Sequence, residues 1–150
     1  MKSIAIIGGG NLGASMAHGL LRSNFCPPSS LTVTRRNIER LYPLQAAGVM
    51  ITDNNEEAIR QSEVIIVALK PYNVKEVLNK LAAHFDPARH VVISVVTGVS
   101  LQDLSAILPT GIPLFRAMPN TAIAIQESVT CICQQHASPT QIEYVKQLFD

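Results

Sequence analysis

The chain has 150 residues, of which 47% are hydrophobic and 5% aromatic, and its formal net charge at pH 7 is +1. This length suits a single domain and is short for a two-domain enzyme. The balanced charge argues against a nucleic-acid-binding surface, and no apolar run approaches the roughly 20 residues that a membrane helix needs. The chain has three cysteines, an odd number, and no secretory leader, so we expect a soluble, cytoplasmic protein whose partner is a small molecule.

Short β-branched runs alternate with segments of helical periodicity. The predicted strands cover residues 3–7, 31–34, 49–52, 64–69, 91–96 and 114–117. Several are apolar at consecutive positions, which suits a parallel sheet with helices on both faces. Apolar residues at helical spacing predict helices in residues 12–21, 74–81 and 101–108, the last capped by Ser100. The alternation predicts an α/β fold built from βαβ units around a mostly parallel sheet.

The second of the helices that this pattern requires contains a proline. That helix begins near Ile38, and Pro43 falls inside it. Because proline removes a backbone donor and clashes with the preceding turn, we expect the helix to kink or restart at Tyr42-Pro43.

The order of elements changes beyond Pro119. Only about ten residues separate the strand at 114–117 from the next β-like run, residues 128–133, and this is short for a helical crossover. The last strand is therefore predicted to be antiparallel. Ser138-Pro139-Thr140-Gln141 has the form of a capping box with proline at the first helical position, so a final helix is expected to begin there.

Three glycines follow the first predicted strand and open the first predicted helix. Gly8, Gly10 and Gly13 form the pattern G-x-G-x-x-G. In a dinucleotide site Gly8 allows the tight turn, Gly10 lets the backbone approach the pyrophosphate, and Gly13 lets helix and strand pack closely. The phosphates would meet free N–H groups and the positive end of the helix dipole. A compact turn without a ligand is the alternative, but the position favours a phosphate site in a Rossmann-like, doubly wound sheet.

The end of the second predicted strand indicates which dinucleotide binds. An NAD site places Asp or Glu there to hold the ribose 2′-hydroxyl, whereas this corner is Thr34-Arg35-Arg36 and has no carboxylate. Two guanidinium groups could instead hold a 2′-phosphate, so NADP(H) is expected, with NAD(H) as the alternative. The arginines could also be ordinary surface charges. Against that, they precede a helix, where positive charge opposes the helix dipole.

Four motifs together resemble pyrroline-5-carboxylate reductase. They are Gly8-Gly9-Gly10-Asn11-Leu12-Gly13, Thr34-Arg35-Arg36, Ala68-Leu69-Lys70-Pro71 and Arg116-Ala117-Met118-Pro119-Asn120-Thr121. The resemblance covers the whole chain but only the amino-terminal, cofactor-binding part of that enzyme. Leu12 stands where methionine is usual, which conserves volume. Besides the glycines and the Thr34-Arg35-Arg36 corner, the resemblance implies cofactor contacts from Asn11, Leu12, Ala68, Leu69, Lys70, Pro71, Thr97, Met118 and Asn120.

The resemblance also implies an activity. The family reduces the cyclic imine L-Δ1-pyrroline-5-carboxylate to proline, the last step of proline biosynthesis, with hydride from NAD(P)H and no metal. In that family a second, helical domain follows, which dimerises and completes the substrate pocket. The final predicted helix stops at Asp150 with neither a capping glycine nor a following strand, so we expect the natural chain to continue. The isolated chain is then inactive, its catalytic residues lie elsewhere, and the full protein is a homo-oligomer.

Other interpretations remain at this point. Another imine reductase or a β-hydroxyacid dehydrogenase would have a similar first domain, and a non-catalytic NADP-binding or sensor module is an alternative of a different class. Individual residues also have structural alternatives: Asn11 could cap the first helix, Asn120 could be a turn residue, and Lys70 could be a solvated strand end. Cys131 and Cys133 share one face of a strand and are predicted to be buried without a chemical role.

Overall fold

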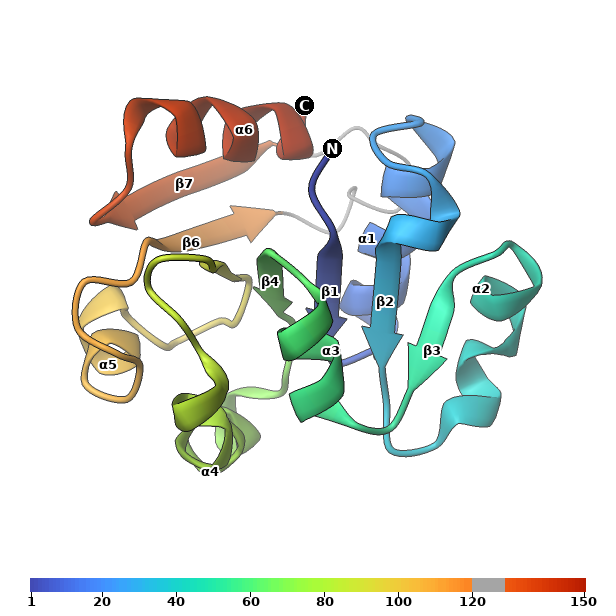
Figure 1. Cartoon of the computed structure of the whole chain (residues 1–150), viewed down its shortest axis with the longest axis horizontal. Coiled ribbons are helices and arrows are strands. Elements are labelled where there is room, and N and C mark those ends of the chain that lie inside the picture. Colours follow the sequence, from blue (N-terminus) through green and yellow to red (C-terminus); the bar gives the residue numbers. More distant parts are fainter. Residues whose placement is uncertain (120–128) are drawn as a thin grey trace.

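The computed structural model describes residues 1–119 and 129–150. Helices and strands alternate along the chain (Figure 1). Short 3-10 helices occur at Pro28–Ser30, Ile38–Leu41 and Ala82–His84. The longer elements are β1 (Ile4–Ile7), α1 (Asn11–Arg22), β2 (Leu31–Thr34), α2 (Tyr42–Ala46), β3 (Met50–Thr52), α3 (Asn55–Gln61), β4 (Val64–Val67), α4 (Pro71–Leu81), β5 (Val91–Ser94), α5 (Leu101–Ser105), β6 (Leu114–Pro119), β7 (Thr130–Gln135) and α6 (Pro139–Phe149).

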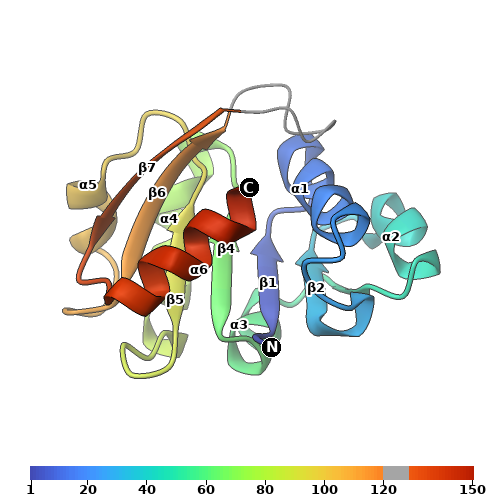
Figure 2. The same ribbon diagram turned by 90° about the horizontal axis from the view of Figure 1, so that it is seen from above.

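The strands of the described residues form one seven-stranded sheet in the order β3-β2-β1-β4-β5-β6-β7. The pairs from β3 to β6 are parallel, and β7 is antiparallel to β6. Figure 2 shows β6 and β7 side by side at one end of the sheet. The predicted α/β, Rossmann-like fold with a mostly parallel sheet and an antiparallel last strand is confirmed.

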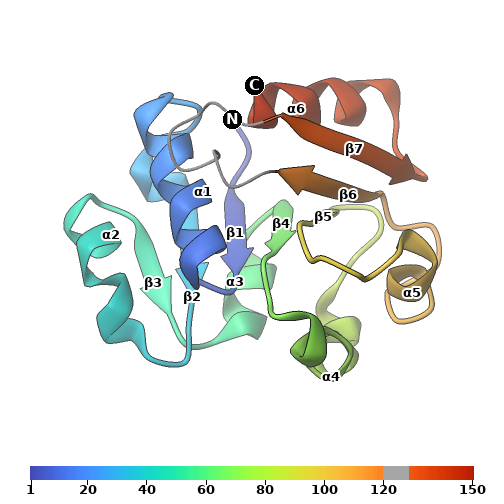
Figure 3. The ribbon, with the colours of Figure 1, turned by 180° about the vertical axis from the view of Figure 1, so that it is seen from behind.

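Helices cover both faces of the sheet, as the consecutive apolar residues of the strands predict. One core packs α1, α2 and α6 against one face, and a second core packs α3, α4 and α5 against the other. In Figure 3 α1 lies in front of β1, whereas α3 lies on the front face in Figure 1. All four residues of β1 are fully buried because successive side chains enter opposite cores.

The segment around Pro43 restarts as expected. A 3-10 helix covers Ile38–Leu41, and α2 begins at Tyr42 with Pro43 in its first turn, where a missing N–H costs no helical hydrogen bond. The capping boxes begin the helices expected of them: Ser100 accepts a hydrogen bond from Asp103 N, and Ser138 accepts one from Gln141 N. Both pairs are reciprocal.

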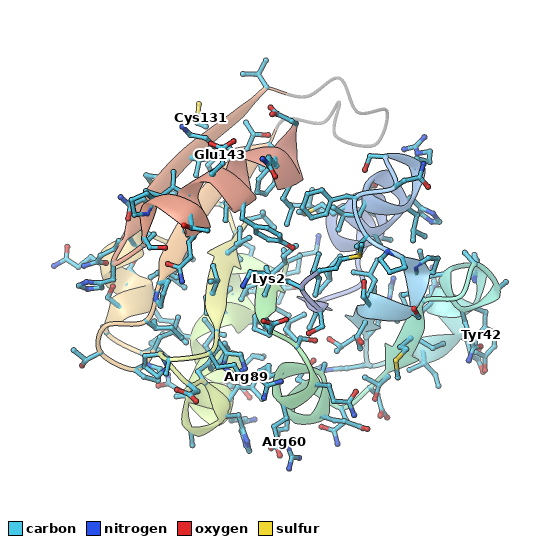
Figure 4. The ribbon with its side chains drawn as sticks, turned by 45° about the horizontal axis from the view of Figure 1, so that its top comes forward. Lys2, Tyr42, Arg60, Arg89, Cys131 and Glu143 are labelled. Carbon is cyan, nitrogen blue, oxygen red and sulfur yellow. The ribbon has the colours of Figure 1, made fainter. Side chains whose placement is uncertain are left out.

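One prediction about the last strand is wrong. Cys131 and Cys133 share a face of β7, as expected, but both thiols are free and both residues are exposed rather than buried. Figure 4 shows the Cys131 side chain projecting outward from the rim of the molecule. The reason is that α6 covers the opposite face of β7, where Ile132 packs against the core. Within the described part of the chain, no helix has the length and apolar character needed to cross a bilayer.

Candidate functional site

The site is built at the carboxyl ends of neighbouring parallel strands. The last residue of β1, Ile7, is in register with Thr34 of β2 and with Val67 of β4. Val67 in turn is in register with Ser94 of β5. The segments that follow these strands therefore leave the sheet at the same edge, where open α/β sheets bind ligands. The sequence motifs at residues 8–13, 34–36, 68–71 and 97 all lie along this edge.

Each of the three motif glycines meets a different steric requirement. Gly8 has φ +108°, a conformation that side chains rarely adopt, and a Cβ there would lie 2.5 Å from the carbonyl oxygen of Ala68. A Cβ on Gly13 would collide with the carbonyl oxygen of Gly8, so helix and strand pack as closely as predicted. A Cβ on Gly10 would have no atom of residues 1–119 or 129–150 within 4 Å. Gly8 and Gly13 are thus required by the fold, whereas Gly10 borders open space.

Gly9, which the G-x-G-x-x-G pattern leaves unspecified, is also closely packed. A Cβ at this position would lie 2.6 Å from Cδ2 of Leu41 and 2.9 Å from Cγ1 of Val33. The loop therefore packs against the start of the α2 region as well as against β2. The unbroken Gly8-Gly9-Gly10 triplet was the available signal, since a third adjacent glycine exceeds what the dinucleotide pattern needs.

The glycine loop is tied to the end of β2 by hydrogen bonds. Gly9 N donates to the backbone oxygen of Thr34 at 2.6 Å, and Gly8 N donates to the Thr34 hydroxyl at 3.3 Å. Nη1 of Arg35 donates to the carbonyl oxygen of Gly9 at 2.8 Å. Thr34 is only 2% exposed, so this corner is an internal support of the glycine loop.

The amino terminus of α1 has no side-chain cap. Gly10 is the N-cap residue and makes no side-chain hydrogen bond, while Asn11 is the first helical residue and is exposed. The alternative role of Asn11 as the helix cap is therefore wrong, because Asn11 lies one residue too late. A helix with a glycine cap leaves first-turn N–H groups for solvent or for an anion. Leu12 is half-buried and packs against the core.

The two arginines have different surroundings. Arg35 is half-buried and bonded to the glycine loop, whereas Arg36 is exposed. The pKa of Glu76 in α4 is lowered, chiefly by its hydrogen bond to Lys80 and by the Lys80 charge, with a smaller contribution from the charge of Arg36. The two arginines thus differ in burial.

The segment after β4 runs directly beside the glycine loop. Ala68 N donates to the carbonyl oxygen of Ile7 at 2.9 Å, and both Ala68 and Leu69 are half-buried. Lys70 is the exposed N-cap residue of α4, and Pro71 begins that helix. After β5, Thr97 is exposed beside Gly98, whose φ is +77°.

The end of β6 is the last strand end along this edge of the sheet, and the described residues reach Pro119 there. Met118 is half-buried and lies opposite Cys131 of β7. Arg116, on the same strand, has a buried Nε without a hydrogen-bond partner among the described residues. Asn120 lies outside the described residues. In the ranges 1–119 and 129–150 no group of three or more His, Cys, Asp or Glu side chains could hold a metal ion.

Sequence comparisons identify relatives of the chain. A sequence model of the family described as NADP oxidoreductase coenzyme F420-dependent matches residues 3–98. The chain is 36% identical over 143 residues to pyrroline-5-carboxylate reductase 2 of Dictyostelium discoideum. This alignment covers 93% of this chain and 48% of that protein. It is also 36% identical over 157 residues to pyrroline-5-carboxylate reductase of Mycobacterium tuberculosis, covering 100% of this chain and 52% of that protein.

Comparison with solved structures agrees with the sequence. A pyrroline-5-carboxylate reductase from Coxiella burnetii superposes with a TM-score of 0.92 at 25% identity, covering 99% of this chain and 55% of that one. The resemblance inferred from the four motifs is therefore confirmed. The chain spans about half the length of these relatives.

Proposed function

The chain belongs to the NADP oxidoreductase family described as coenzyme F420-dependent, and from this premise we propose that it is the NADPH-binding domain of a pyrroline-5-carboxylate reductase. The observation that carries the proposal is the loop after β1, where Gly10 borders open space at the uncapped start of α1. That cradle suits a pyrophosphate, and a side chain would occupy it. The relatives named as pyrroline-5-carboxylate reductases supply the proposed substrate class, a cyclic imine.

The proposed cofactor site divides into three parts. The pyrophosphate is received by backbone N–H groups at the start of α1, and the adenosine 2′-phosphate by the corner after β2. The nicotinamide end lies along the ends of β4, β5 and β6. In these roles we propose Gly8, Gly10, Asn11, Leu12, Gly13, Thr34, Arg35, Arg36, Ala68, Leu69, Lys70, Pro71, Thr97, Met118 and Asn120.

The proposed reaction makes few demands on this domain. When bound, NADPH would supply a hydride to the imine carbon of L-Δ1-pyrroline-5-carboxylate, and the nitrogen would keep the proton of the iminium form, giving L-proline. A protonated imine is already electrophilic, so the main task of the residues along the strand ends is to hold the two partners within about 3–3.5 Å. We assign no catalytic acid or base to this chain.

Substrate binding is proposed to need a second, C-terminal domain, because the chain spans about half the length of its relatives. In the same proposal the full protein is a homo-oligomer through that domain and works in the cytoplasm on a small molecule, without nucleic acid or membrane. The 150-residue chain alone is then expected to bind cofactor and to show no turnover.

Calorimetric titration with NADPH and NADH tests the cofactor half of the proposal. NADPH should bind more tightly than NADH, because only NADPH carries the 2′-phosphate that the arginine corner can pair. If neither dinucleotide binds, the proposal is wrong. The reaction half is tested by adding L-Δ1-pyrroline-5-carboxylate with NADPH and following NADPH absorbance. Oxidation of NADPH by a chain extended to the length of its relatives, and none by this chain, is the expected result; proline formation by this chain alone would contradict the division into domains.

A further inference from the structure

Arg35 makes a hydrogen bond whose position suggests more than recognition of a 2′-phosphate. Its Nη1 donates at 2.8 Å to the carbonyl oxygen of Gly9, which lies 26 residues earlier in the chain. We propose that Arg35 is a positioning residue that orients the glycine loop for the pyrophosphate, and that it therefore supports NADH binding as well as NADPH binding. This inference rests on the proposed function.

The geometry of the peptide between Gly9 and Gly10 supports this role. The described residues contain no cis peptide bond, and in a trans peptide the C=O and N–H groups point in opposite directions. A guanidinium that holds the Gly9 oxygen toward β2 therefore turns the Gly10 N–H away from β2. A Cβ on Gly10 would meet no atom within 4 Å in the part of the chain that the structure describes, which leaves room there for an anion to approach this residue.

The charge of Arg35 adds to the orientation. A hydrogen bond from a cation to a carbonyl oxygen is stronger than a neutral one and polarises the peptide, which makes its N–H a better donor. The other bonds that tie the loop down, from Gly8 N and Gly9 N to Thr34, involve neutral groups. Arg35 is thus the charged member of the clamp between β2 and the glycine loop.

The two arginines are then expected to differ in function. A guanidinium has five N–H donors, so Arg35 can hold Gly9 and still offer donors to a 2′-phosphate. Arg36 is exposed, and its charge contributes slightly to the lowered pKa of Glu76 in α4. Loss of Arg35 should weaken the binding of every ligand that contains the pyrophosphate. Loss of Arg36 should weaken the binding only of ligands that carry a 2′-phosphate.

Two ligands separate these roles in calorimetry of the 150-residue chain. ADP-ribose carries the pyrophosphate without a 2′-phosphate, and NADPH carries both. Arg35→Met is expected to raise the Kd of ADP-ribose by about tenfold, since one charge-assisted hydrogen bond no longer orients the loop, and to raise the Kd of NADPH by at least as much, since a donor to the 2′-phosphate is also lost. The matched variant Arg36→Met should raise the Kd of NADPH and leave that of ADP-ribose unchanged.

A spectroscopic readout distinguishes orientation of the loop from a general loss of structure. The amide proton resonance of Gly10 should shift when ADP-ribose binds to the wild-type chain, and Arg35→Met should reduce the shift at equal saturation. Thermal unfolding of each variant shows whether it is folded. If Arg35→Met does not fold, Arg35→Gln replaces it. This variant tests the same hydrogen bond, because the shorter amide cannot reach the Gly9 oxygen from the same backbone position.

The outcomes separate this inference from the proposed function. If the wild type and the Arg35 variant bind ADP-ribose with equal affinity, the inference about Arg35 is wrong, but the proposal that the chain binds NADPH still stands. Failure of the wild-type chain to bind either ligand would overturn the proposed function and the inference with it. Weakened ADP-ribose binding in the Arg35 variant alone supports the positioning role.

Discussion

Gly8 at the end of β1 faces the carbonyl group of Ala68 at the end of β4, and a Cβ on Gly8 would lie 2.5 Å from that oxygen. The same residue has φ +108°. Because the obstacle is backbone directly after the neighbouring strand rather than a flexible side chain, neither partner can move aside without disturbing the end of the sheet. This contact holds together two of the segments that we propose form the dinucleotide site.

Gly8→Ala should therefore destabilise the fold by about 2–4 kcal/mol, combining backbone strain with the displacement of Ala68. Urea unfolding measures the change. Gly19→Ala is the matched control, because Gly19 lies inside α1 and a Cβ there would meet no atom of the described residues within 4 Å. This control should gain about 0.5–1 kcal/mol from helix propensity. Equal stabilities of Gly8→Ala and the wild type would contradict the geometry of the turn.

The thiols should fall into two classes of reactivity. Cys131 and Cys133 are exposed on β7, whereas Cys26 is 4% exposed and burial raises the pKa of its thiol. An aromatic disulfide reagent should modify two thiols rapidly in the native chain and the third only after unfolding. The double variant Cys131→Ser/Cys133→Ser should lose the rapid phase completely. A rapid phase that persists in it would show that Cys26 is accessible.

Buried His90 should make stability fall in acid. Its Nδ1 accepts a hydrogen bond from Asp86 N at 2.8 Å, and its Nε2 lies 3.1 Å from the carbonyl oxygen of Ile59, an arrangement that suits a neutral ring. Burial is the largest influence on the pKa of His90 and lowers it below 6.5. The hydrogen bond to Ile59 raises this pKa but by less, while the charge of Arg89 lowers it and that of Asp86 raises it. The unfolded chain thus binds a proton that the folded chain resists.

The direction in which His90 changes stability with pH decides which pH values should be compared. The stability that neutral His90 contributes is complete above pH 6.5 and is lost as the pH falls from there through the lower pKa of the folded state. The slope is at most about 1.4 kcal/mol per pH unit. The free energy of unfolding is measured with urea at pH 7.5 and pH 5.5, which lie about one unit above and below the ordinary histidine pKa. The difference between the two free energies should be smaller for His90→Gln than for the wild type. The exposed His136→Gln is the control, and an unchanged difference in His90→Gln would count against this role.

Much of the fold could be predicted because its strands have a strong local signature. Consecutive β-branched residues such as those of β4 and β5 indicate strands buried on both faces, and Pro43 indicates where α2 restarts. Helix α3 was not predicted. Its buried face consists of only Ala58 and Ile59, too few residues to show a helical period, although Asn54 caps it by accepting from Glu57 N.

Tertiary packing explains what local patterns could not supply. Cysteine is among the most buried residue types, so burial was expected at Cys131 and Cys133. Which face of β7 is covered depends on α6, and that helix packs on the face of Ile132. At the site, the glycine pattern predicted the tight turn at Gly8 and the close packing at Gly13, while the approach of a pyrophosphate at Gly10 stays a prediction. The hydrogen bond from Arg35 to Gly9 could not be predicted, because it joins positions 26 residues apart.

The central claim is that the loop after β1 binds the pyrophosphate of NADPH through the open side of Gly10. Calorimetric titration of NADPH into the wild type, Gly10→Ala and the control Gly19→Ala tests it most directly. Gly10 has φ −72°, which alanine adopts freely, so Gly10→Ala should lose about 1 kcal/mol of stability or less. We expect Gly19→Ala to bind NADPH like the wild type and folded Gly10→Ala to bind at least tenfold more weakly. NADPH affinity equal in all three chains would contradict a phosphate site at this loop.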